Sequence, residues 1–395
     1  MQNQRSPILY LGNAFRRRGD FAFGLNQADR LQHLYIIGQT GTGKTTLVAN
    51  LIDQDIRHGQ GLCLIDPHGD LACELAEHLG PDDIYWDVAN PASPYGYNPL
   101  TRTSPALRPL VCSGLIDALK KQWQDAWGVR MEHLLRYAIL ALLEQPQTDL
   151  RDILRLFIDR PFRKQVIDQV TNPQVDHFWT LEFPAMNYKT AIDGVAPIAN
   201  KIGAFLAHPI VRRAVCEPEE PLRLRRLMDE GHVLIINLAK GRIGSDVANV
   251  LGGLIVASIM NAALSRHDTP EPDRTPFMLY LDEFASFTTL AITSMLSETR
   301  KYGLGLTLAH QHIAQADPDV YEAILGNVGS VLAFRVGAFD APAIAKQLVT
   351  IEQSGLINLP NYRAYAQINV DGTKTKTFSM TTWPRDERFR EQPAA

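Results

Sequence analysis

Two kinds of hydrophobic pattern divide the chain. Residues 1–104 and 221–395 contain short continuous apolar runs, each followed by a polar turn or a helical stretch. Such runs are typical of strands buried on both faces, as in a parallel sheet. Between residues 105 and 220, apolar side chains instead recur every three to four positions, which indicates helices. The pattern predicts an α/β protein whose central, mostly parallel sheet is flanked by helices, with an inserted all-helical subdomain.

The apolar runs also set the expected boundaries. We expect a first part of the α/β domain at 1–104, the helical insertion at 105–220, and the second part at 221–395. Near the end, residues 365–378 show two alternating strands joined at Asp371 and Gly372, a pair that favours a tight hairpin. The tail from Trp383 is expected to be poorly ordered. The expected strands of the sheet are 35–37, 61–66, 83–87, 232–238, 276–281, 304–311 and 330–336.

A glycine-rich loop follows the first of these strands. Residues 38–45 fit the P-loop pattern G-x-x-x-x-G-K-[ST]. Glycines there let backbone N–H groups turn toward a polyphosphate at the positive end of the next helix. Lys44 would reach the β- and γ-phosphates of ATP, and Thr45 would hold Mg²⁺. The alternative is a glycine-rich turn that binds nothing. The expected nucleotide-binding residues are Gly38, Thr40, Gly41, Thr42, Gly43, Lys44, Thr45, Thr46 and, at the end of strand 61–66, Asp66.

The strand at 276–281 ends in two acids, the arrangement called Walker B. Asp282 would order Mg²⁺ through water, and Glu283 would activate the water that attacks the γ-phosphate. Acidic pairs after apolar strands are common by chance. The Walker B interpretation of this pair is supported by the P-loop, which precedes it by a plausible domain length.

Two further residues are candidates for the catalytic set. Gln311 ends the strand 304–311 and is placed to sense the γ-phosphate, although a capping glutamine is the alternative. Arg300 lies just before that strand, where it could reach the nucleotide of an adjacent subunit as an arginine finger. Its alternative is a solvated charge at a helix end, and the competitors for its role are Lys301, Arg335 and Arg363.

The amino-acid composition limits the partners and the cell compartment that the sequence supports. The formal net charge of −4 gives no global basic field for nucleic acid, although a local groove or pore remains open. The four cysteines are far apart and show no metal-ligand spacing, so a reducing cytoplasm fits best. No secretory signal is recognisable at the N-terminus. The uncharged window Val247–Leu264 is long enough for a membrane span, but we interpret it as a buried helix.

The motifs together resemble the FtsK/HerA superfamily of DNA-pumping ATPases, most closely its conjugative (type IV secretion) coupling-protein branch of the TraG/TraD type. The resemblance rests on the P-loop, on Asp66-Pro-His-Gly-Asp70, on Leu281-Asp-Glu-Phe284, and on Glu298-Thr-Arg-Lys-Tyr-Gly-Leu304 followed by Gln311. It implies a RecA-like P-loop NTPase fold and ATP hydrolysis between the subunits of a ring, expected to be a homo-hexamer, that moves DNA through a central channel. By this likeness Lys44, Glu283, Arg300 and Gln311 are the catalytic residues, and Thr45 and Asp282 bind magnesium.

The resemblance leaves the membrane attachment, the partners and the exact function of the chain open. Membrane-anchored coupling proteins carry transmembrane helices before the P-loop, whereas only 37 residues precede Gly38 here, and none of them forms a span. This difference leaves open a soluble relative, a form trimmed of its anchor, or a mobile-element or defence ATPase. We expect a soluble, cytoplasmic form, which partners could hold at the inner face of the membrane. The helical insertion would lie at one mouth of the channel, where relaxase, DNA or secretion-system proteins are candidate partners. Two functions remain: a DNA-translocating motor, and an ATP-switched docking module that recruits protein substrates. A HerA-like DNA-processing ATPase is a further variant.

Overall fold

The computed structural model describes residues 7–15, 19–186, 188–286 and 291–385. The last ten residues of the predicted tail and the predicted helix start at Leu290 lie outside this part. The chain forms two compact units. The first contains residues 1–85, 225–237 and 266–395, and the second contains 86–224 and 238–265. The predicted insertion at 105–220 falls within the second unit, which is larger than the prediction.

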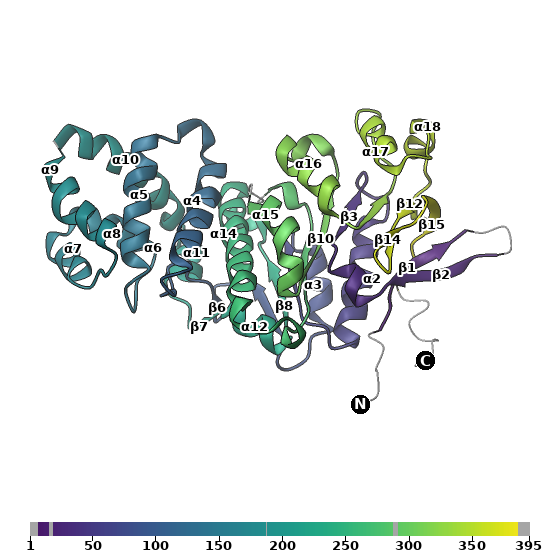
Figure 1. The fold of residues 1–395 in the computed structure, drawn as a ribbon, viewed down its shortest axis with the longest axis horizontal. Coiled ribbons are helices and arrows are strands. Elements are labelled where there is room, and N and C mark those ends of the chain that lie inside the picture. Colours follow the sequence, from purple (N-terminus) through teal and green to yellow (C-terminus); the bar gives the residue numbers. More distant parts are fainter. Residues whose placement is uncertain (1–6, 16–18, 187, 287–290, 386–395) are drawn as a thin grey trace. The chain divides into compact units, whose positions relative to one another are not determined.

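The first unit contains a mixed sheet (Figure 1). The sheet has 11 strands in the order β2-β1-β15-β12-β11-β3-β10-β9-β4-β8-β5, and only the first half of β5 lies within this unit. The pairs from β11 through β3, β10, β9 and β4 to β8 are parallel, as predicted. At one side the sheet continues in antiparallel strands. The strands are β1 (Leu9–Ala14), β2 (Phe21–Leu25), β3 (Leu34–Ile37), β4 (Leu62–Asp66), β5 (Ile84–Asp87), β8 (Val233–Asn237), β9 (Phe277–Leu281), β10 (Leu304–His310), β11 (Ser330–Ala333), β12 (Arg363–Gln367) and β15 (Phe378–Thr381).

Helices accompany the parallel strands of this unit. Every residue of β3, β4, β8, β9 and β11 is buried, which explains their unbroken apolar sequences. The core forms where β3 and β4 meet α2 through Ile36, Leu51, Ile52 and Leu64. The helices are α1 (Gln27–Arg30), α2 (Lys44–Arg57), α3 (Asp70–Ala76), α12 (Leu224–Glu230), α15 (Ala291–Glu298), α16 (Pro318–Asn327), α17 (Ala341–Leu348) and α18 (Gln353–Ile357), with short 3-10 turns at Ser265–Asp268, Glu271–Asp273, Phe284–Ser286, Thr299–Tyr302 and Ile313–Gln315.

The two ends of the described chain meet in the sheet. The predicted hairpin is present: β12 and β15 are its legs, and β13 (Asn369–Val370) and β14 (Thr373–Lys374) form its tip around Asp371 and Gly372, both with positive φ. The expectation of a poorly ordered tail is wrong for residues 383–385. Trp383 is buried beside Tyr10, because its indole N–H finds a partner in Asn13 and its carbonyl accepts from α2.

The second unit is predominantly helical (blue to teal, with α14 in green, in Figure 1). An aromatic cluster stabilises it, with Tyr137 stacked on Phe178 at 4.1 Å between ring centroids and Trp179 edge-on to Phe178. The elements are α4 (Arg108–Gln122), α5 (Val129–Leu142), α6 (Leu150–Ile158), α7 (Arg160–Ile167), α8 (Pro173–His177), a π-helical turn (Phe178–Glu182), α9 (Phe183–Ala185), α10 (Tyr188–Ala207), α11 (Pro209–Cys216), α13 (Lys240–Ile243), α14 (Ser245–Leu264), a 3-10 turn (Gln124–Ala126), and the short strands β6 (Tyr95–Gly96) and β7 (Glu220–Pro221).

The apolar helix α14 packs against α4. Together with the following turn, Ser245–Asp268 has the length and hydropathy of a membrane span, but 61% of its most apolar window is buried within the protein. This burial agrees with the interpretation of Val247–Leu264 as a core helix.

Candidate active site

The P-loop joins β3 to α2 in the way that the sequence predicts. A Cβ on Gly38 would lie 2.6 Å from the Cβ of Phe334, and one on Gly43 would lie 3.0 Å from Cδ1 of Tyr362. Gly41 and Gly43 have φ values of 74° and 112°, which favour glycine. Gly43 also begins α2 without a side-chain cap. The first N–H groups of that helix are therefore available to an anion.

Lys44 is the first residue of α2 and is only 5% exposed. Its Nζ donates to the backbone carbonyl of Gln39 at 3.1 Å, so the ammonium is folded back over the loop. Burial lowers the pKa of Lys44, while the charges of Glu283 and Asp282 act in the opposite direction. The amine thus lies in the field of the two Walker B acids. Of the predicted threonines, Thr40 and Thr45 are exposed, Thr46 is half-buried, and buried Thr42 donates to the Gln39 carbonyl.

The two acids follow β9 directly. Asp282 is 9% exposed and accepts a hydrogen bond from the backbone N–H of Glu283 at 3.1 Å. Burial, followed by the charges of Asp66 and Glu283, raises the pKa of Asp282 to about 7. Glu283 has a φ of 49°, a left-handed conformation uncommon for this residue type. Such a conformation is often found at functional sites, where the surrounding fold maintains it.

Gln311 connects the P-loop with the Walker B acids. It immediately follows β10, which lies between β3 and β9 in the sheet. The Oε1 atom of Gln311 accepts from the Thr40 hydroxyl at 2.8 Å, and its Nε2 donates to Oε1 of Glu283 at 2.5 Å. The capping alternative does not describe this side chain, because both of its partners are side chains of the predicted site.

Asp66 lies beneath this cluster with both carboxylate oxygens engaged. Oδ1 accepts from the N–H of His68 and Oδ2 from the N–H of Ala72, each at 2.9 Å. The carboxylate therefore holds the turn between β4 and α3. Its charge reaches the site through its effect on Asp282.

Arg300 lies apart from this cluster. It belongs to the turn Thr299–Tyr302 and is exposed, and its side chain forms no hydrogen bond or ion pair with the described residues. The competitors differ in their surroundings. Arg335 contacts the P-loop of its own chain through Gln39 Oε1 at 3.4 Å, and the guanidinium of Arg363 lies 5.1 Å from the ring centroid of Phe15. Exposed Lys301 lies over the ring of Tyr302.

Sequence reasoning missed two aromatic residues of the site. His310 is fully buried, and its ring contacts those of Tyr35 and Phe284. Its backbone carbonyl accepts a hydrogen bond from the N–H of Gly38. Burial, with a smaller effect of the Lys44 charge, lowers the pKa of His310 to about 3. Its position beside Gln311 was a usable signal. Tyr362 touches the P-loop from a distant segment, and no local pattern marked it.

The geometry fits a nucleotide and magnesium. The glycine cradle and the uncapped helix match a polyphosphate, and Thr45 with Asp282 offers oxygen ligands of the kind Mg²⁺ prefers. Within the described residues no group of three or more His, Cys, Asp or Glu side chains could hold a metal. This agrees with Mg²⁺ sites, which take most of their ligands from phosphates and water.

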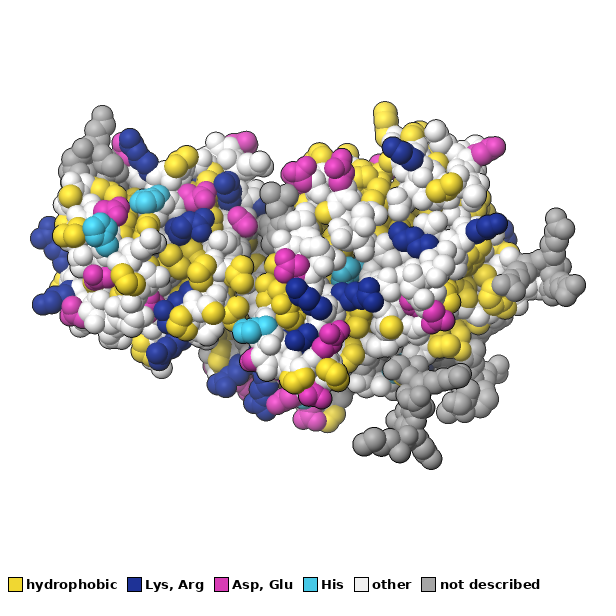
Figure 2. Space-filling model, in the orientation of Figure 1, with side chains coloured by type: hydrophobic (Ala, Val, Ile, Leu, Met, Phe, Trp, Pro, Cys, Tyr) yellow, Lys and Arg dark blue, Asp and Glu magenta, His cyan; other side chains and the backbone are white. Residues whose placement is uncertain are grey.

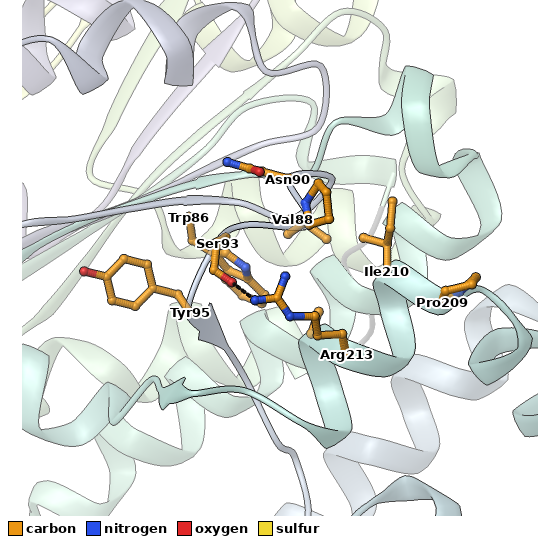
Figure 3. Close-up of a pocket in the computed structure, with 10 residues that line it drawn as sticks. Trp86, Val88, Asn90, Ser93, Tyr95, Pro209, Ile210 and Arg213 are labelled. Carbon is orange, nitrogen blue, oxygen red and sulfur yellow. Dashed lines mark hydrogen bonds between the residues drawn. The ribbon is translucent and has the colours of Figure 1, made fainter.

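A separate cavity of about 170 Å³ lies in the second unit (Figure 3). Trp86, Val88 and Ile210 contribute to its mainly apolar lining, and Arg213 donates to the Ser93 carbonyl at 2.8 Å. None of the predicted site residues lines this cavity.

Comparison with protein families identifies the chain. The family described as "Helicase HerA, central domain" matches residues 22–259, which is more than half of the sequence. The chain belongs to this HerA family. Residues 276–348 of this HerA-family chain also match the family described as "TraM recognition site of TraD and TraG". The two matches confirm the predicted resemblance and make the chain a coupling-protein-like P-loop NTPase.

Solved structures share this fold. The conjugative coupling protein TrwB, in its trigonal form with sulphate, is 17% identical with a TM-score of 0.66, over 91% of this chain and 87% of that one. TrwB with ADP and Mg²⁺ is 17% identical with a TM-score of 0.65, over 92% and 88%. VirB4 of Thermoanaerobacter pseudethanolicus is 15% identical with a TM-score of 0.65, over 98% of both chains. No curated protein matches the chain.

Proposed function

We propose that this HerA-family chain is an ATPase that moves DNA through a homo-oligomeric ring, a hexamer by analogy, during conjugative or mobile-element transfer. The observation that carries the proposal is the side-chain path from Thr40 through Gln311 to Glu283. It links the P-loop with the acid that would activate water. A chain that only binds nucleotide has no need of such a connection.

Each group in the site has its own role in binding or hydrolysing ATP. The backbone N–H groups of residues 41–46 and the Lys44 ammonium bind the phosphates, and Thr45 and Asp282 hold Mg²⁺, which neutralises phosphate charge when bound. Glu283 accepts the proton of the attacking water. Gln311 orients that water and reports the presence of the terminal phosphate to the P-loop.

Arg300 acts on the nucleotide of a neighbouring subunit. An arginine finger must be exposed and unpaired within its own chain, and Arg300 meets both conditions among the described residues. Arg335 fits this role less well because it contacts its own P-loop. On the face shown in Figure 2, basic and acidic side chains are interspersed, so this face gives no support for a DNA path.

A second function is an ATP-switched docking module that recruits relaxase or other proteins. The match of residues 276–348 to the TraM recognition site of TraD and TraG favours it, because this region includes the Walker B acids and Gln311. A partner bound there would contact the segment that surrounds the nucleotide.

Steady-state ATP hydrolysis, measured with and without single- and double-stranded DNA, tests the motor. We expect stimulation by DNA, loss of turnover in Lys44→Ala and Glu283→Gln, and inhibition of wild type when Arg300→Ala is mixed into it. Lys346→Ala, a change at an exposed lysine of α17, is the control and should leave the activity of the mixture unchanged. Slow turnover that ignores DNA, combined with nucleotide-dependent binding of relaxase, would overturn the motor in favour of the docking module.

A further inference from the structure

The P-loop has a second neighbour on the side away from the catalytic acids. In the sheet order β12-β11-β3-β10-β9, the strands that end at Gln311 and Asp282 lie on one side of β3, and β11 and β12 lie on the other. Residues 334–362 connect β11 to β12. This connection therefore borders the loop opposite the end where phosphate chemistry is expected.

Backbone contacts fix this connection to the P-loop. The N–H of Gln39 donates to the Arg335 carbonyl, and the N–H of Tyr362 donates to the Thr42 carbonyl, each at 2.8 Å. The side chain of Tyr362 approaches closely enough that a Cβ on Gly43 would lie 3.0 Å from its Cδ1 atom. Tyr362 is thus held directly against the start of α2.

Tyr362 has two features that packing alone does not explain. Its φ is 63°, which is unfavourable for a bulky aromatic residue, and its backbone is held at both ends, since its carbonyl accepts from Thr382 N–H at 2.9 Å. Its side chain nevertheless remains 47% exposed. The fold therefore maintains a strained backbone that presents an aromatic ring to solvent beside the P-loop.

The polar side chains of the site indicate in which direction a bound nucleotide extends from the P-loop. Lys44, Glu283 and Gln311 define where the terminal phosphate lies, so the nucleoside must leave the loop toward β11 and β12. We propose that Tyr362 is the stacking platform for the base of the nucleotide. This inference rests on the proposed NTPase function and assigns its nucleoside subsite. Aromatic stacking accepts any base, because every base has a π-face.

Binding of ATP and of inorganic tripolyphosphate, each with Mg²⁺, separates stacking from simple support of the loop. We expect Tyr362→Ala to weaken ATP and GTP binding about 5- to 150-fold and to leave tripolyphosphate binding unchanged. Tyr362→Phe should bind like wild type. Phe339→Ala, at a fully exposed phenylalanine of the same connection, is the control and should bind both ligands normally.

Three results would overturn the proposal. Equal weakening of ATP and tripolyphosphate in Tyr362→Ala would mean that the ring only supports the P-loop. Unchanged ATP binding would place the base elsewhere. If wild type binds neither ligand, or Lys44→Ala binds both normally, the P-loop is not the nucleotide site, and the NTPase proposal fails as well. Retained tripolyphosphate binding also shows that the variant is folded around its P-loop.

Discussion

A buried ion pair joins α1 to the helix that follows the P-loop, and its disruption should strongly destabilise the first unit. Arg30 contacts Asp55 of α2 through two hydrogen bonds of 2.8 and 2.6 Å. Tyr280 of β9 donates to the same carboxylate at 2.6 Å. The arginine side chain is 7% exposed and the aspartate is fully buried. Burial opposes charge on Arg30, but Asp55 and Tyr280 together more than compensate, so that the pKa of Arg30 is raised.

The expected magnitude follows from this burial. Asp55→Leu leaves a buried guanidinium without its counter-charge, which should cost about 3–5 kcal/mol of unfolding free energy. For a unit of this size that corresponds to roughly 6–20 °C in Tm. Tyr280→Phe removes the hydrogen bond that the hydroxyl donates to Asp55 and a longer one, of 3.3 Å, that it accepts from Arg30. The loss of the bond to the carboxylate alone should cost about 1.5–3 kcal/mol. The double change Arg30→Met with Asp55→Leu should cost less than the sum of the two single changes, because no unpaired charge remains.

Urea unfolding followed by circular dichroism measures these differences. Arg226→Ala is the control, because it breaks an exposed i,i+4 pair with Glu230 and should leave the stability nearly unchanged. The reasoning is refuted if Asp55→Leu resembles this control, or if the double variant is as unstable as the two single variants added together.

Two other predictions concern ligand binding. Burial, and then the charge of Asp66, raises the pKa of Asp282 to about 7, so the carboxylate becomes protonated as the pH falls through this value. Mg²⁺-dependent nucleotide affinity should therefore decrease as the pH is lowered from about 8 to about 6. A titration in which Asp282→Asn keeps the same pH dependence would contradict this. Gly43→Ala should reduce nucleotide affinity at least about tenfold, because the new Cβ would lie against Tyr362 and the φ of 112° is unfavourable for alanine. Gly203→Ala, where a Cβ would have no neighbour within 4 Å, should bind nucleotide normally. Equal affinities of the two variants would contradict the steric argument.

The sequence predicts the parallel part of the fold well because its strands are continuous apolar runs that end in recognisable chemistry. The edge strand β2 and its neighbour β1 were not predicted. Residues 9–14 contain a glycine and an asparagine, and their burial depends on pairing with β15 at the far end of the chain. Trp383 was misjudged for a related reason. A polar, charged tail gives no local sign that its first residues pack on Tyr10.

The same limit applies to the site. Lys44, Asp282 and Glu283 lie in local motifs, and Gln311 was located because a strand end next to Walker B has a defined neighbourhood. Tyr362 comes from a turn more than 300 residues after the P-loop. Its contact with Gly43 is created by the sheet order alone, which no periodicity in the sequence reveals.

The pairing of β1 with β15 has a consequence for synthesis on the ribosome. Asn13 meets Thr381 in this ladder, so the N-terminal hairpin must wait for almost the whole chain before its open edge is covered. At translation rates of about 5–20 residues per second, that delay is roughly 20–70 s. Throughout it the hairpin offers unpaired backbone groups to other nascent chains. Yield in cells should therefore depend on chaperones that shield this edge, even where the finished protein is stable.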